Sequence, residues 1–180
     1  ISKTPQYNLA FSFGFIVLVA GITMFYVFGY NFLRAEKAYA QAMKAKDRNY
    51  VYDKLNKALE LRQNYDDYHV AMAKYYLDKA YREANKKGKD INQISQLLAQ
   101  ALKEANKAAK LSPNKVSVWE NLASMYGNIA AISSQANQWV IKSLNKAIEL
   151  EPSNAHLRSK LAAYYAKEKE YEKAIKNYNK

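Results

Sequence analysis

The feature that most constrains this chain is an uncharged stretch near its start, which runs from Thr4 to Leu33. A helix rises about 1.5 Å per residue, so the mostly apolar residues 8–33 are long enough to cross a bilayer. The alternative is a cleaved signal peptide, but such a peptide has a shorter apolar core of about 7 to 15 residues. We therefore predict a flank at residues 1–7 and a transmembrane helix at residues 8–33.

Three glycines recur within this predicted span, and they lie roughly on one side of the helix: Gly14, Gly21 and Gly29. A stripe of small residues lets another helix come close in lipid. The stripe therefore indicates a neighbouring transmembrane helix as a partner, in addition to the lipid bilayer. Glycine is also common in membrane helices in general, so the pattern leaves both interpretations open.

The rest of the chain has the composition of helices joined by short turns. The whole sequence contains only five glycines and three prolines, and helix-favouring residues such as alanine and lysine are abundant. The sequence therefore predicts an all-α fold. No helix breaker separates Leu33 from Lys46, so we expect the transmembrane helix to continue as the first helix of a domain at residues 34–180. The absence of cysteine excludes disulfides and thiolate metal sites.

A helical repeat is clearest near the carboxyl end, where a turn at Pro152 separates two helical segments. If Ala155 is position one, small residues stand at positions eight and twenty, namely Ala162 and Ala174. Small side chains at these positions let the two antiparallel helices of a hairpin approach, while larger side chains fill the groove beside them. The larger residues stand at positions seven, eleven and twenty-four: Leu161, Tyr165 and Tyr178.

Earlier segments repeat this pattern and divide the domain into units at about residues 34–65, 66–115, 116–154 and 155–180. The last unit ends inside its second helix, so we expect it to be truncated. The second unit carries about 16 extra residues, and we expect both of its helices to be longer by about two turns. The third unit carries a surplus of about five residues near 127–138.

These positions and their spacing resemble the tetratricopeptide repeat (TPR), whose period is about 34 residues. The resemblance implies a right-handed solenoid of helical hairpins. A closer resemblance, to the carboxy-terminal TPR region of bacterial O-antigen ligase and polymerase membrane proteins, rests on three segments: ENLASMYGNI, ANQWVIKSLNKAIELEPSNA and AAYYAKEKEYEKAIKNY. The catalytic loops of those proteins lie among membrane helices that this sequence does not contain, so no catalytic residue carries over.

A TPR solenoid usually binds a peptide or a partner's helix in a concave groove lined by the first helix of each unit. On the register above, the residues at groove-facing positions are polar and weakly charged. They are Asp67, Val70 and Lys74, then Ser117, Glu120, Asn121 and Ser124, then His156, Ser159 and Ala163. This set does not reproduce the Lys/Asn clamp with which some TPR proteins hold a terminal carboxylate. The groove therefore indicates a protein or peptide partner of unknown identity.

The chain lacks the motifs of the common catalytic and cofactor sites. Its two histidines, His69 and His156, are not at metal-ligand spacing, so we expect a surface or groove role for both. No glycine-rich phosphate loop and no G-x-S-x-G motif is present. We therefore expect no catalytic residue, no cofactor and no metal ligand in this sequence.

The charge and the aromatic content raise the possibility of a nucleic-acid partner. The net charge is +12, and 16 tyrosines are available for stacking on bases. Most tyrosines, however, stand at repeat packing positions, and the lysines are spread at helical spacing, as on a solvated outer face. We therefore expect no nucleic-acid partner.

Two functions fit these features. The first is a membrane-anchored TPR scaffold that mediates protein–protein interaction or assembly and is not an enzyme. The second, which comes from the resemblance, is the carboxy-terminal TPR region of a multi-pass O-antigen ligase/polymerase-like glycan transferase whose catalytic part is not in this chain. Further hydrophobic segments upstream of Ile1 would favour the second function.

The side of the membrane is a separate question, and we expect the membrane to be the bacterial cytoplasmic one. Positive residues are enriched in cytoplasmic flanks. The amino side of the span carries Lys3 alone, whereas the carboxyl side carries Arg34, Lys37, Lys44, Lys46 and Arg48. The charges therefore favour a cytoplasmic domain, while the resemblance to ligases favours the opposite side.

Overall fold

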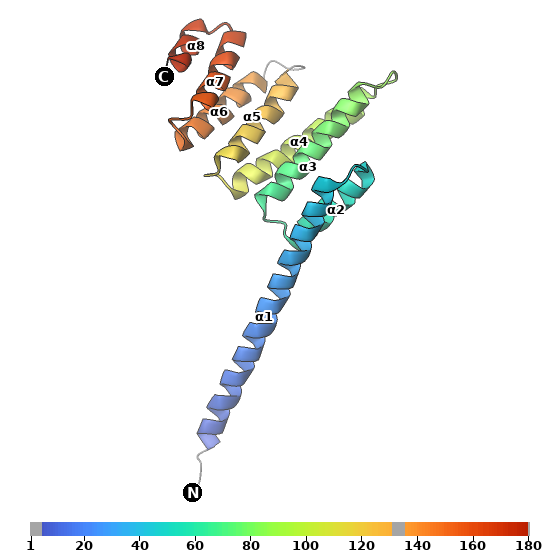
Figure 1. Ribbon diagram of the computed structural model, residues 1–180, viewed down its shortest axis with the longest axis vertical. Helices are drawn as coiled ribbons and strands as arrows, with labels where there is room; N and C mark the ends of the chain where they lie inside the picture. The colour runs from blue at the N-terminus through green and yellow to red at the C-terminus, as the bar shows by residue number, and fades with distance from the viewer. Residues whose placement is uncertain (1–4, 131–135, 180) are drawn as a thin grey trace. The chain divides into compact units, whose positions relative to one another are not determined.

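The computed structural model describes residues 5–130 and 136–179, with side chains from residue 11 onward (Figure 1). The described residues form eight α-helices and no strand, which confirms the predicted all-α class. The helices are α1 Pro5–Lys44, α2 Arg48–Leu61, α3 Asp66–Ala84, α4 Ile91–Leu111, α5 Val116–Ala130, α6 Ala136–Leu150, α7 Ala155–Lys167 and α8 Tyr171–Tyr178. They belong to two compact units, Ile1–Gln63 and Asn64–Lys180, which are described separately.

In the first unit, α1 is a single helix of 40 residues, which corresponds to about 60 Å. It covers the predicted span and continues to Lys44, so the expected continuation without a break is confirmed. The part from Phe11 to Lys44 is long and apolar enough to cross a membrane, and none of its most apolar 18-residue stretch is buried. Residues 1–4 of the predicted flank lie outside the described residues, and residues 5–7 open α1.

The last turns of α1 pack against α2 as a helical hairpin. The hairpin is closed by small and branched side chains with exposed fractions of at most 7%: Ala35, Ala38 and Ala42 from α1, and Val51, Leu55 and Ala58 from α2. Asp47 caps α2, because its Oδ1 accepts a hydrogen bond of 2.7 Å from the backbone N–H of Tyr50. Leu55 and Ala58 are both fully buried in this contact.

The second unit consists of three hairpins that lie side by side, α3–α4, α5–α6 and α7–α8 (Figure 1). Position eight of the repeat is buried in each hairpin, since Ala73, Ala123 and Ala162 have exposed fractions of 1%, 3% and 0%. A methyl group at these positions lets the paired helices approach. Larger apolar side chains fill the space between one hairpin and the next, and Leu122, Leu144 and Leu161 are each at most 3% exposed.

The extra residues of the second predicted unit lengthen its helices. Helices α3 and α4 have 19 and 21 residues, whereas α5 and α6 have 15 each. The break between α3 and α4 ends at Asp90, whose Oδ1 caps α4 by accepting hydrogen bonds from the N–H groups of Asn92 and Gln93. The surplus predicted near 127–138 falls partly on residues 131–135, which lie outside the described residues.

Candidate functional site

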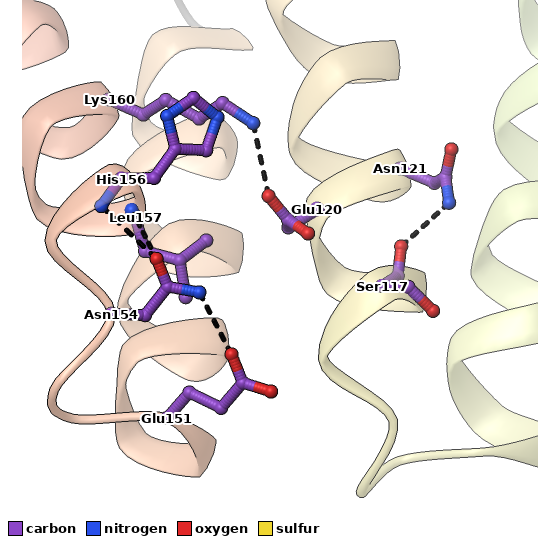
Figure 2. A network of polar contacts seen from close by, with 8 residues as sticks. All are labelled: Ser117, Glu120, Asn121, Glu151, Asn154, His156, Leu157 and Lys160. Atoms are coloured by element: carbon purple, nitrogen blue, oxygen red, sulfur yellow. Dashed lines mark hydrogen bonds and ion pairs between the residues drawn. The ribbon is translucent and has the colours of Figure 1, made fainter.

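The predicted groove residues lie on α3, α5 and α7, the first helices of the three hairpins in the second unit. Several of them are exposed to solvent, namely Lys74, Ser117, Ser124, His156, Ser159 and Ala163. Helices α5 and α7 present neighbouring parts of this set, which Figure 2 shows from close by. We call the exposed face of these three helices the groove surface.

An ion pair crosses the groove surface between α5 and α7. Lys160 Nζ of α7 lies 3.0 Å from Glu120 Oε1 of α5, and Figure 2 shows the lysine reaching across to the carboxylate. Both side chains are partly exposed, so the pair adds about 0–1 kcal/mol at most. Its main consequence is geometric, because it ties the two first helices together at the surface.

The start of α7 is fixed by a cap beside this pair. Asn154 Oδ1 accepts hydrogen bonds of 3.1 Å and 3.3 Å from the N–H groups of His156 and Leu157 (Figure 2). The amide of Asn154 in turn donates to Glu151 Oε2 at 2.9 Å. On α5, Asn121 Nδ2 donates to the backbone oxygen of Ser117 at 2.6 Å, so this amide is directed along its own helix.

A second set of ion pairs joins α3 to the segment that precedes α5. Lys115 Nζ lies 2.7 Å from Asp66 Oδ2 and 2.7 Å from Asp67 Oδ1. Partial burial by itself lowers the pKa of Lys115, but the hydrogen bonds and charges of the two aspartates together raise it above its ordinary value. Lys115 therefore stays protonated at neutral pH and holds the two carboxylates.

These contacts change the interpretation of part of the predicted set. Asp67 binds Lys115 of the turn before α5, and Glu120 binds Lys160 of the next hairpin, so both carboxylates are engaged within the stack. Val70 is half-buried and packs against the core between α3, α4 and α5. The neutral polar residues Ser124 and Ser159 of the set are exposed.

One functional expectation is wrong, because His69 lies in the interior and not at the surface. Its exposed fraction is 2%, and its Nδ1 lies 2.5 Å from Glu104 Oε2 of α4. This hydrogen bond lowers the pKa of the Glu104 carboxyl, against the opposing effect of burial. The repeat register contained the signal: His69 stands at position four, where the third unit has the packed residue Trp119. His156, by contrast, is exposed as expected.

The glycines of the predicted membrane helix face open space. A methyl group added at Gly14, Gly21 or Gly29 would meet nothing within 4 Å. Elsewhere, no group of three or more histidine and acidic side chains in the described part of the chain is arranged to hold a metal ion.

Comparison with known proteins supports the fold. No family model and no curated protein matches this sequence. Two crystal structures of MamA, which are TPR solenoids, match it at low sequence identity. The match to the first structure has a TM-score of 0.59 and a sequence identity of 14%, and it covers 81% of this chain and 74% of the MamA chain. The match to the second structure has a TM-score of 0.57 and a sequence identity of 20%, and it covers 85% of this chain and 70% of the MamA chain.

These matches confirm the predicted right-handed TPR solenoid, which here follows one long apolar helix. Because the identities are so low, the likeness concerns the fold alone. Nothing in the comparisons supports the resemblance to O-antigen ligases and polymerases.

Proposed function

We propose that this chain is a membrane-anchored TPR scaffold, without catalytic activity of its own, that binds a protein or peptide partner on the groove surface. On this proposal, residues 8–33 form the membrane span and the repeat units cover residues 34–180. The observation that carries the proposal is the exposed row of small and neutral side chains on α5 and α7, including Ser117, Ser124 and Ser159. The Glu120–Lys160 pair links α5 and α7 beside this row.

The apolar helix supplies the argument for an anchor. Its large side chains are exposed, with Phe11 at 79%, Phe25 at 83% and Leu33 at 66%. Apolar surface of this extent is costly in water and is covered when the helix lies in lipid. Gly14, Gly21 and Gly29 would let a neighbouring transmembrane helix approach within the bilayer.

The anchor is tested by fractionating cells that express the chain. We expect it in the membrane fraction and resistant to alkaline carbonate, whereas a shortened chain that begins at Ala35 should stay in solution. Release of the full chain by carbonate would contradict the proposed span.

The groove surface is tested by photo-crosslinking in intact membranes. A photoreactive side chain at Ser124 or at Ser159 should capture the same partner, because the two positions lie on neighbouring first helices. The matched control position is Asn145, which is also exposed but lies on α6, a second helix. Equal capture at all three positions, or capture at Asn145 alone, would contradict a groove on the first helices.

The proposed location of the domain is the cytoplasmic side of a bacterial cytoplasmic membrane, as the positive flank after Leu33 favours. The chain has no cysteine, so Lys87→Cys, in the exposed turn after α3, introduces a single reactive thiol. We expect a membrane-impermeant maleimide to label this thiol only after the cells are opened. Labelling of intact cells would overturn the cytoplasmic assignment.

A further inference from the structure

A second candidate site lies on α4, α5 and α6, outside the groove surface. These helices and the turn after α4 enclose a hollow of about 380 Å³, near the lower end of the range of about 300–1,000 Å³ that is usual for ligand sites. We call it the aromatic hollow. Its lining residues are Asn106, Ala109, Lys110, Pro113, Trp119, Leu122, Tyr126, Trp139, Lys142 and Ser143.

The hollow contains both tryptophans of the chain. Trp139 is 50% exposed and stacks on Tyr126, with ring centroids 5.8 Å apart and an angle of 22° between the planes. Lys142 Nζ lies 5.1 Å from the centroid of the Trp139 ring. A large aromatic face is thus held rigidly at the surface by its neighbours, and rigid tryptophan and tyrosine side chains dominate the binding energy of protein interfaces.

The aromatic hollow is distinct from the groove surface because it lies on the other side of α5. With about 3.6 residues per turn, Trp119 and Tyr126 project on the side of the helix opposite to Ser117 and Ser124. A partner in the hollow would therefore leave the groove surface accessible.

Three neutral hydrogen-bond donors that line the hollow are already directed at protein acceptors. Trp119 Nε1 donates to the backbone oxygen of Pro113 at 2.7 Å. Asn106 Nδ2 and Ser143 Oγ each donate at 2.8 Å to a backbone oxygen of their own helix. A sugar or a nucleobase needs several such groups for its own polar atoms, whereas an apolar side chain needs none. The interior of the hollow therefore suits an apolar or aromatic group.

The charges at the hollow are of one sign. Lys110 and Lys142 both contribute to its lining, and none of the other described residues that line it is acidic. In residues 5–130 and 136–179, neither lysine takes part in an ion pair with a carboxylate, in contrast to Lys115 and Lys160. An occupant that carries carboxylates beside an apolar group would satisfy both the interior and the lysines.

We infer that the aromatic hollow is a docking site for a short acidic segment of a partner protein. The segment places an aromatic or branched apolar side chain against Trp139 and its carboxylates on Lys110 and Lys142. The inference rests on the proposed function only in that the chain binds proteins, and it does not require the groove surface to be occupied.

The position of the two tryptophans provides a direct assay, because all tryptophan fluorescence of the chain comes from the hollow. The probe is a synthetic peptide without tryptophan that has a central phenylalanine between glutamates and aspartates, titrated into the full chain in detergent micelles. We expect a saturable change in the emission. A peptide with glycine in place of the phenylalanine should bind about tenfold more weakly, because the buried apolar group is lost.

Charge reversal tests the two lysines. Lys110→Glu and Lys142→Glu should each weaken the probe about tenfold, since attraction to a carboxylate is replaced by repulsion. Lys87→Glu is the matched control, because it changes the net charge equally at an exposed turn that does not line the hollow. This control should stay within about twofold of the unaltered chain, and circular dichroism should show the same helix content in all variants.

Several outcomes would overturn the inference. These are the absence of a saturable change, an equal loss of affinity in Lys87→Glu, and tighter binding of an oligosaccharide of uronic acids than of the peptide. Ser124→Arg separates this inference from the proposed groove. This variant should weaken partner binding on the groove surface and leave the affinity for the peptide, measured by fluorescence, unchanged. A loss of peptide affinity in this variant would place the peptide on the groove surface.

Discussion

Replacement of Gly127 by alanine probes the contact between α5 and α7. A methyl group added at Gly127 would lie 2.2 Å from Tyr164 Oη and 3.3 Å from Tyr164 Cζ. Tyr164 is half-buried and packs against a core cluster that includes Val140 and Leu161, and this burial raises its pKa. The Tyr164 ring therefore has little room to move, yet its hydroxyl must shift by about 1 Å to make space for the methyl group.

Two effects of opposite sign set the size of the change. In a helix interior, alanine is favoured over glycine by about 0.5–1 kcal/mol. Overpacking in a filled site costs about 1–3 kcal/mol. We expect Gly127→Ala to lower the free energy of unfolding by about 1 kcal/mol. In a Tyr164→Phe background the nearest atom is gone, so the same change should raise the free energy of unfolding by about 0.5 kcal/mol or more.

The assay is a double-mutant cycle followed by denaturant unfolding of the full chain in detergent, with helix content as the signal. The expected coupling energy between the two positions is about 1–3 kcal/mol. Gly88→Ala is the control, because a methyl group there meets nothing within 4 Å. Additive effects of Gly127→Ala and Tyr164→Phe, or a stabilising Gly127→Ala on its own, would refute the close approach and the reasoning built on it.

Three further predictions concern stability. Ala123 and Ala162 are 3% and 0% exposed where paired helices cross, so a leucine at either position should overpack the crossing. Each change should lower the free energy of unfolding by about 1–3 kcal/mol in denaturant. An unfolding midpoint equal to that of the unaltered chain would contradict the repeat register. Lys169, in the turn before α8, has a φ of 64°, a backbone conformation that glycine adopts more readily than other residues. Lys169→Gly should therefore raise the free energy of unfolding by about 0.5–1 kcal/mol, and a lower thermal midpoint would contradict this prediction. The hydrogen bond from His69 holds the pKa of Glu104 below its ordinary value, so ionised Glu104 stabilises the fold at pH values above that ordinary pKa. This stabilisation is lost as the pH falls through the folded-state pKa. In Glu104→Gln, the thermal midpoint should fall less steeply between about pH 6 and about pH 3 than in the unaltered chain. An unchanged dependence of the midpoint on pH would exclude Glu104 as the source of the acid destabilisation.

The parts of the fold that sequence reasoning predicted are those in which spacing along the chain reports packing directly. The uncharged run up to Leu33 predicted the exposed apolar part of α1. The small residues at position eight, such as Ala123 and Ala162, predicted where paired helices cross, because a hairpin brings residues of fixed separation together. The extra residues of the second unit predicted longer helices for the same reason, and α3 and α4 are longer.

The contacts that sequence reasoning missed join residues whose separation follows no period. His69 and Glu104 are 35 positions apart, and their pairing depends on the lengthened hairpin that the extra residues create. Lys115 meets Asp66 only because the turn before α5 returns to the start of α3. The aromatic hollow requires three helices to converge, and Trp139 lies just after a surplus whose length the repeat does not fix.

If both proposals hold, the two surfaces of α5 recognise their partners differently, because the charged side chains are paired within the protein on one surface and not on the other. Where the groove surface runs over α5 and α7, Glu120 is bound to Lys160, so on the proposed function recognition there falls to neutral side chains such as Ser124 and Ser159 and depends on shape. At the aromatic hollow, no carboxylate in the described part of the chain pairs with Lys110 or Lys142, so the docking inferred there depends on charge and should weaken as salt rises. A scaffold that carries both surfaces on one helix can hold two partners at once, and a partner on one surface leaves the other open. The salt dependence therefore distinguishes the two sites in one experiment, because binding on the groove surface should change little between low and high ionic strength while the acidic peptide is released.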